Sequence, residues 1–131
     1  MRVIVCLDDR DGVRFNGRRQ SRDRAVVADI LATTVGPLRM TADTATLFAE
    51  AAERVQISAS PLTDAAAGDT CVLETAFLPD AAVEELVVYR WNRVYPADEY
   101  VNLPAARRLI AREEWAGFSH ERITKEVWGL R

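Results

Sequence analysis

Apolar and polar positions alternate in blocks along the first half of the chain. Residues 2–7 ("RVIVCL") form an apolar run of β-branched character, which is typical of a strand buried on both faces. Residues 8–20 are polar and glycine-punctuated, which predicts a loop, and Ser21 is a favourable N-cap for the next helix. In that helix the apolar residues from 26 to 34 fall on one face, and Gly36-Pro37 is expected to end it.

The same patterns continue to the end of the chain. We expect a short strand at 37–40 and, capped by Thr41 or Asp43, a helix over 44–55. Further strands are expected at 55–58, 70–78 and 84–91, with loops at 61–69 and 92–104 and a turn or one short helix at 79–80. Residues 106–113 fit a helix or a strand, and residues 120–128 alternate like an edge strand.

This order of elements defines a fold class. Strands that alternate with helices pair in parallel, while the strand-rich end adds antiparallel pairs. We therefore predict a single α/β domain over residues 1–131, with a compact, mostly parallel sheet, an antiparallel C-terminal edge and a few flanking helices. Ligands of such sheets bind beyond the carboxyl ends of the strands, where the segment after residue 7 would lie.

Composition and charge narrow the classes of function. The chain has 131 residues, 49% of them hydrophobic and 28% charged, with a net charge of −3, so nucleic acid is not an expected partner. No apolar stretch is long enough to cross a membrane, and the N-terminus does not fit a signal peptide, so we expect a cytoplasmic protein of bacterial type. A single histidine and no closely spaced cysteine pair predict no metal site.

The segment 8–24, "DDRDGVRFNGRRQSRDR", carries most of the candidate chemistry. It holds six arginines and four aspartates. Guanidinium groups bind phosphate or carboxylate in a bidentate manner, and a helix N-terminus attracts anions. The residues that we expect to bind an anionic ligand are Arg14, Asn16, Arg18, Arg19, Gln20 and Ser21. The alternative is a surface loop in which the aspartates neutralise the arginines.

Two residues are candidates for acid–base catalysis. Asp23 stands at the start of the predicted helix, and His120 is the only histidine, the side chain suited to proton transfer near neutral pH. Ser119 precedes His120, but neighbours in a strand face opposite sides, so this pair alone forms no catalytic unit.

Asp8 and Asp9 fit a magnesium site or, more simply, a turn. The segment 89–100 mixes aromatic and basic residues and fits base stacking or core packing.

Several segments, taken in order, resemble the dihydrofolate reductase family. "VIVCLDDRDGVRFNG" is similar to that family's first strand and mobile loop, and "ILATTVGPLRMTADTATLF" to its helix end, short strand and next helix. "RVQIS", "FLPDAAVEELVVYRWNRVYPADEYV" and "ARRLIAREE" resemble later strands and the acidic, tyrosine-bearing loop. The resemblance implies a shortened reductase-like fold over most of the chain.

The family's functional residues are largely replaced. Its Gly-Gly nucleotide signature corresponds to "CVLETAFLPD", and its phosphate-binding arginine corresponds to Ala42. We therefore do not expect NADPH to bind, and the sequence does not indicate which cofactor, if any, the protein uses. Of the Met-Gly-Arg-x-Thr element, Thr44 is retained. The position of the family's catalytic carboxylate is Val26, and Asp23 and Asp29 each lie three residues away.

A second resemblance is narrower. Short bacterial proteins that carry an automatic label of ribonuclease Z resemble this chain in the segment 8–24 and in "FSHERITKEV". The metal-binding motif of that enzyme is absent here.

We therefore expect a small-ligand-binding or enzymatic domain on a degenerate reductase-like scaffold, with a phosphorylated or carboxylated ligand at the arginine-rich segment. The alternatives are an interaction, immunity or regulatory subunit, which includes a homo-oligomer, and a nucleic-acid-processing protein.

Overall fold

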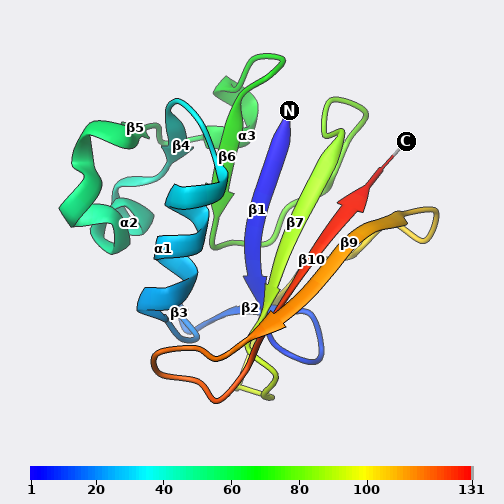
Figure 1. Cartoon of the computed structure of the whole chain (residues 1–131). Helices are drawn as coiled ribbons and strands as arrows, with labels where there is room; N and C mark the ends of the chain where they lie inside the picture. The colour runs from blue at the N-terminus through cyan, green and yellow to red at the C-terminus, as the bar shows by residue number, and fades with distance from the viewer. Residues whose placement is uncertain (131) are drawn as a thin grey trace.

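The computed structural model describes residues 1–130, in which seven strands form one sheet in the order β5-β4-β6-β1-β7-β10-β9 (Figure 1). Their bounds are β1 Arg2–Leu7, β4 Leu38–Met40, β5 Val55–Ile57, β6 Thr70–Leu73, β7 Glu85–Arg90, β9 Arg108–Trp115 and β10 Ile123–Gly129. A second, three-stranded sheet consists of β2 Gly12–Phe15, β3 Arg18–Arg19 and β8 Glu99–Tyr100. The helices are α1 Arg24–Thr33, α2 Ala42–Ala45, the 3₁₀ helix η1 Thr46–Arg54, and α3 Pro61–Asp64.

The pairing confirms the predicted fold class. Strand β1 pairs in parallel with β6 and β7, and β4 pairs in parallel with β5 and β6. Strand β10 is antiparallel to both β7 and β9, so the antiparallel part is the C-terminal edge. The outermost strand is β9 rather than the 120–128 segment, and its exposed side chains include the charges of Arg112, Glu113 and Glu114, which discourage pairing with another chain.

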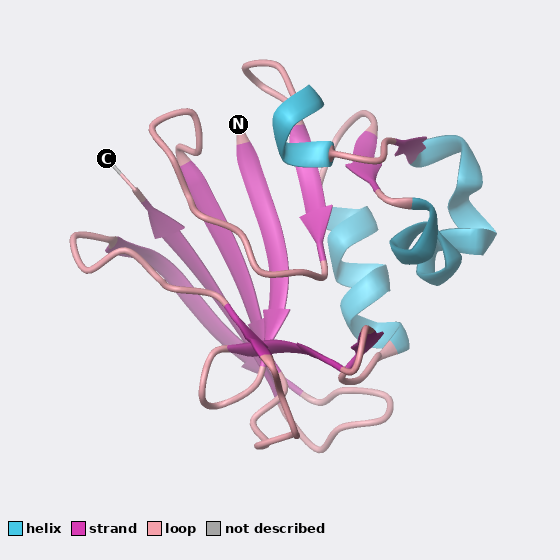
Figure 2. Cartoon of the chain, turned by 180° about the vertical axis from the view of Figure 1, so that it is seen from behind, coloured by secondary structure: helices cyan, strands magenta, loops and turns pink. Residues whose placement is uncertain are grey.

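Two apolar cores lie on opposite faces of the sheet, because successive side chains of a strand alternate. Ile4 of β1 packs with Val26 and Ile30 of α1 and with Phe48 of η1. On the other face, Val3, Val5 and Leu7 of β1 belong to a core with these residues: Cys71, Leu73, Val83, Leu86, Val88 and Val101. Seen from behind, this second face is crossed by long loops rather than by a long helix (Figure 2).

The structure corrects the prediction of a loop over 8–20. Strands β2 and β3 form a hairpin there, joined by Asn16-Gly17 with positive φ angles of 53° and 70°. Asn-Gly favours the type I′ turns that close two-residue hairpins. The helix cap is also corrected: Asp23, and not Ser21, is the N-cap of α1, and its side chain accepts from the N–H of Ala25.

Other boundaries differ as well. The helix predicted over 44–55 is split into α2 and η1, and η1 has non-helical backbone at Phe48 and Ala51. Of the two expected caps, Thr41 and Asp43, it is Thr41 that caps α2. Residues 61–64 form α3 inside a predicted loop, and the strand expected over 70–78 ends at Leu73. Within the segment 106–113, the residues from Arg108 onward belong to strand β9, and the predicted loop 92–104 contributes β8.

The packing of α1 on the sheet yields a direct stability prediction. Ile30 is 2% exposed in the core under α1, whereas Val35, just beyond the helix, is 97% exposed. We expect Ile30→Ala to lower the free energy of unfolding by about 2–4 kcal/mol, because it removes buried methyl groups and leaves a cavity. Val35→Ala is the control and should change it by less than about 0.5 kcal/mol in the same urea titration. Equal effects would contradict this packing.

Candidate functional site

A cleft opens at the carboxyl ends of β1 and β6, between the sheet, α1 and η1. Its walls are mainly apolar and include Ile4 and Cys6 of β1, Val26 and Ile30 of α1, and Phe48. Residues 19–23 form its lip, and the cleft is narrow, with a cavity volume of about 30 Å³. A neighbouring hollow between α1, η1 and residues 118–119 shares part of this lining. The cleft therefore lies where open α/β sheets bind ligands.

Asp23, at this lip, joins two distant segments. Its carboxylate caps α1 and accepts hydrogen bonds from three consecutive backbone N–H groups, those of Phe118, Ser119 and His120, at 2.8–3.1 Å. The Nδ1 atom of His120 lies 2.8 Å from Asp23 Oδ2. Gly117 is needed beside it, because an added Cβ would lie 2.7 Å from that same oxygen. The carboxylate is thus fully engaged inside the protein.

This environment controls the charge of Asp23. Burial alone would raise the pKa of its carboxyl group, but hydrogen bonds from His120, Phe118, Ser119 and Ala25 outweigh burial and lower the pKa to about 2. Asp23 is therefore ionised at neutral pH and acts as an acceptor, not as an acid.

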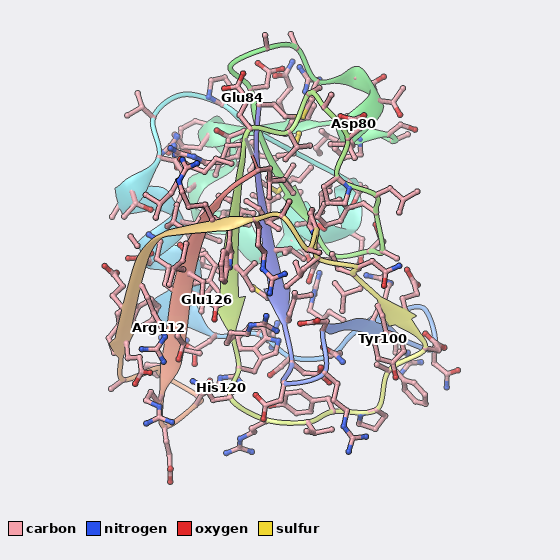
Figure 3. All side chains as sticks on the ribbon, turned by 90° about the vertical axis from the view of Figure 1, so that its right-hand side faces the viewer. Asp80, Glu84, Tyr100, Arg112, His120 and Glu126 are labelled. Carbon is pink, nitrogen blue, oxygen red and sulfur yellow. The ribbon has the colours of Figure 1, made fainter. Side chains whose placement is uncertain are left out.

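His120 continues the chain of contacts to the cleft. Its Nε2 atom lies 3.0 Å from Ser21 Oγ and 3.1 Å from the hydroxyl of Tyr95. Its ring stacks on Trp91 with 4.6 Å between the centroids. His120 is almost buried, at 5% exposed, near the ends of the central strands (Figure 3). The structure therefore brings together three predicted residues, Ser21, Asp23 and His120, that stand up to 99 positions apart.

Two of the predicted arginines are paired with acids. Arg19 makes a two-pronged contact with Glu74, at 2.9 and 3.0 Å, and Arg14 lies 3.0 Å from Asp43. Thr44 also donates to Glu74. The hydrogen bond from Arg14 lowers the pKa of Asp43 despite its exposure. Arg19 lines the cleft, whereas Arg14 lines a separate hollow near α3.

The remaining predicted ligand-binding residues divide between two places. Gln20 lines the cleft, but its side-chain N–H₂ group donates to Asp8 at 3.2 Å. Asn16 and Arg18 line a shallow hollow with Phe15 and Pro96, outside the cleft. Asp8 itself is buried and accepts from backbone N–H groups that include those of Gly12 and Tyr95, so it holds loops together.

Four further residues belong to this site and were not named as site residues from the sequence, although Trp91 and Tyr95 lie in the segment 89–100 and Arg22 in the segment 8–24. Glu74 follows β6, Trp91 follows β7, and Tyr95 lies in the loop beyond it. For Glu74 and Trp91, the available sequence signal was their position directly after a predicted buried strand. Arg22 lines both the cleft and the neighbouring hollow, and within residues 1–130 its guanidinium group makes no ion pair.

The cleft also contains one sulfur atom. Burial, together with the charges of Glu74 and Asp23, raises the pKa of the Cys6 thiol, so it is not a thiolate at neutral pH. In the described part of the chain, no group of three or more His, Cys, Asp or Glu side chains could hold a metal ion. No helix among residues 1–130 is long and apolar enough to span a membrane.

Comparison with solved structures finds the same fold. A dihydrofolate reductase from Enterococcus faecalis, solved with NADP(H) and RAB-propyl, is similar over 98% of this chain and 94% of its own, with a TM-score of 0.62 and 11% sequence identity. The fold is thus dihydrofolate reductase-like, as the sequence resemblance implies, and it is strongly divergent in sequence. No protein-family model and no curated protein matches the chain.

The residues present do not fit the diphosphate of an NADP(H) molecule at the family's nucleotide signature. Strand β6 is followed by Glu74 and a loop, so no glycine pair and no helix N-terminus stand there to receive phosphate. Asp43 adds a further negative charge nearby, where it contacts Arg14. Because Arg14 and Arg19 are paired with Asp43 and Glu74, neither guanidinium group is free to neutralise the phosphates.

The shifted pKa of Asp23 predicts an acid-sensitive contribution to stability. A group whose pKa is lower in the folded protein stabilises it above its unfolded value of 3.8, and this stabilisation is lost as pH falls toward about 2. We expect a loss of about 2 kcal/mol from this residue, because the pKa of its buried carboxyl group falls from 3.8 to about 2 on folding. Urea titrations across this range should show a flatter pH dependence for Asp23→Asn. The same slope in both proteins would contradict the assigned contacts.

Proposed function

We propose that this chain is a small-ligand-binding domain, of a kind that can support catalysis. Its ligand site would be the narrow cleft between β1, α1 and η1 together with the adjoining hollow of about 510 Å³ between α1, η1 and residues 118–119. The ligand has an apolar part and a carboxylate or phosphate group. The observation that carries the proposal is the guanidinium group of Arg22, which lies at the lip of an apolar cleft and makes no ion pair within residues 1–130. A cleft with apolar walls and a few polar groups at its rim is the usual form of a small-molecule site.

The chemistry of the lip supports an anionic group on the ligand. Arg19 is held by Glu74 and contributes little free positive charge, but Arg22 is exposed and lines both adjoining hollows. A guanidinium group binds the oxygens of a phosphate or carboxylate with two parallel hydrogen bonds. Ser21 and Gln20 line the same lip and offer further polar contacts. The apolar part would lie in the adjoining hollow, against Val27, Leu47 and Phe48.

Phenyl phosphate is a suitable probe, because it joins an aromatic ring to a phosphate. We expect it to raise the melting temperature by several degrees, and to do so more than inorganic phosphate or phenol at the same concentration. Arg22→Ala should remove this shift. Arg18→Ala is the matched control, since Arg18 is exposed and lies outside the cleft, and it should keep the shift.

The readout is a thermal unfolding curve for each variant with and without the probe. Arg19 is left intact, because its removal would leave the half-buried carboxylate of Glu74 without its partner and would destabilise the fold. A shift that persists in Arg22→Ala would refute Arg22 as the anchor. No shift from phenyl phosphate or from its carboxylate analogue phenylacetate would refute the proposed ligand class.

A further inference from the structure

Ser21, His120 and Asp23 form one continuous hydrogen-bonded chain. The Oγ atom of Ser21 lies 3.0 Å from His120 Nε2, and His120 Nδ1 lies 2.8 Å from Asp23 Oδ2. A hydroxyl, an imidazole and a carboxylate linked in this order are the groups that activate a serine in hydrolases of unrelated folds, which are recognised by geometry rather than by sequence position. Ser21, His120 and Asp23 make the same contacts in the same order.

The protons in this chain can be assigned. The carboxylate of Asp23 is ionised and can only accept a hydrogen bond, so in the neutral form of the imidazole the one ring proton sits on Nδ1 and is donated to Asp23. Nε2 then has a free lone pair that can accept the proton of the Ser21 hydroxyl. Tyr95 also points its hydroxyl at Nε2, at 3.1 Å, and competes for this single lone pair.

The base is held rigidly, as a catalytic base must be. Trp91 stacks on the imidazole ring, and the backbone N–H of His120 donates to Asp23. Asp23 is in turn fixed by the backbone of α1 and of residues 118–119. The imidazole therefore needs no reorientation before it accepts a proton, which is the form of preorganisation that speeds proton transfer.

Ser21, unlike His120, faces the cleft. The Ser21 side chain lines the apolar cleft and is partly exposed. Within residues 1–130, the backbone N–H of Arg22 has no hydrogen-bond acceptor. In several hydrolases the N–H of the residue after the nucleophile helps to stabilise the oxyanion, so this group is suitably placed along the chain.

We propose that Ser21 is a nucleophile that takes up acyl groups from small esters with an apolar acyl part. The Oγ atom attacks the ester carbonyl carbon while its proton passes to His120 Nε2. The C–O bond to the alcohol then breaks, the alcohol leaves with the proton from Nε2, and the acyl group stays on Oγ. Water, deprotonated by the same nitrogen, hydrolyses the acyl-serine to the carboxylic acid and restores the hydroxyl. His120 is the general base, and Asp23 is a positioning residue.

This inference rests on the proposed function only in that the same cleft holds the ester. The decisive experiment is labelling with phenylmethanesulfonyl fluoride, an uncharged reagent that sulfonylates an activated serine with loss of fluoride. Peptide mapping by mass spectrometry of the wild-type protein shows which serine reacts. We expect Ser21 to be modified, and Ser58, Ser60 and Ser119 to react at least about a hundredfold more slowly.

Three variants test the roles of the neighbours. Ser21→Ala should abolish the modification, whereas Ser60→Ala, at a distant exposed serine, should leave it unchanged. His120→Gln should slow the modification of Ser21 by about a hundredfold or more, because Nε2 no longer accepts the proton. Tyr95→Phe should leave labelling at least as fast as in the wild type, since it removes the competing hydroxyl. Circular dichroism spectra establish that each variant is folded.

The contrary results are equally definite. Equal labelling of all four serines, no labelling of Ser21, or an undiminished rate in folded His120→Gln would overturn the inference. The outcome is separable from the ligand test. Phenyl phosphate binding without Ser21 labelling would refute only the nucleophile, and labelling without phenyl phosphate binding would refute only the anionic ligand.

Discussion

The carboxylate of Asp23 is the constraint on which the rest of the site depends. It lies near the end of the arginine-rich segment 8–24, caps α1, accepts hydrogen bonds from three backbone N–H groups of residues 118–120 and contacts the imidazole of His120. The segment around Asp23 and the segment 118–120 are nearly 100 residues apart in the sequence, and this carboxylate connects them. One ionised side chain therefore fixes the start of the helix over the cleft, the turn between β9 and β10, and the orientation of the only histidine.

The arginine density after β1 has two physical origins. Part of it serves the fold, because Arg14 and Arg19 pair with Asp43 and Glu74 and so bind the β2–β3 hairpin to the start of α2 and the end of β6. The exposed part, above all Arg22, lies beside an apolar cleft. The acids Asp43 and Glu74 therefore serve the fold by holding the hairpin in place.

The sequence was informative where local pattern decides structure. The apolar run of β1, the amphipathic α1 and the cap at Thr41 follow from residue spacing, and the order of segments led to the reductase-like fold that the structural comparison supports. Sequence pattern was not informative where contacts between distant segments determine the structure. Asn16-Gly17 could have signalled the hairpin, but nothing local shows that Glu74 captures Arg19, or that Ser21 rather than Ser119 meets His120. Such pairings depend on how the sheet orders its strands.

The most direct test of this account is the protonation of His120. It is the only histidine, so its ring nitrogens can be observed without ambiguity by long-range proton–nitrogen NMR at mildly alkaline pH. The account predicts a single tautomer, with the proton on Nδ1 facing Asp23 and Nε2 unprotonated. A ring protonated on Nε2, or one that exchanges rapidly between the two tautomers, would contradict it, because Asp23 would then not hold the imidazole.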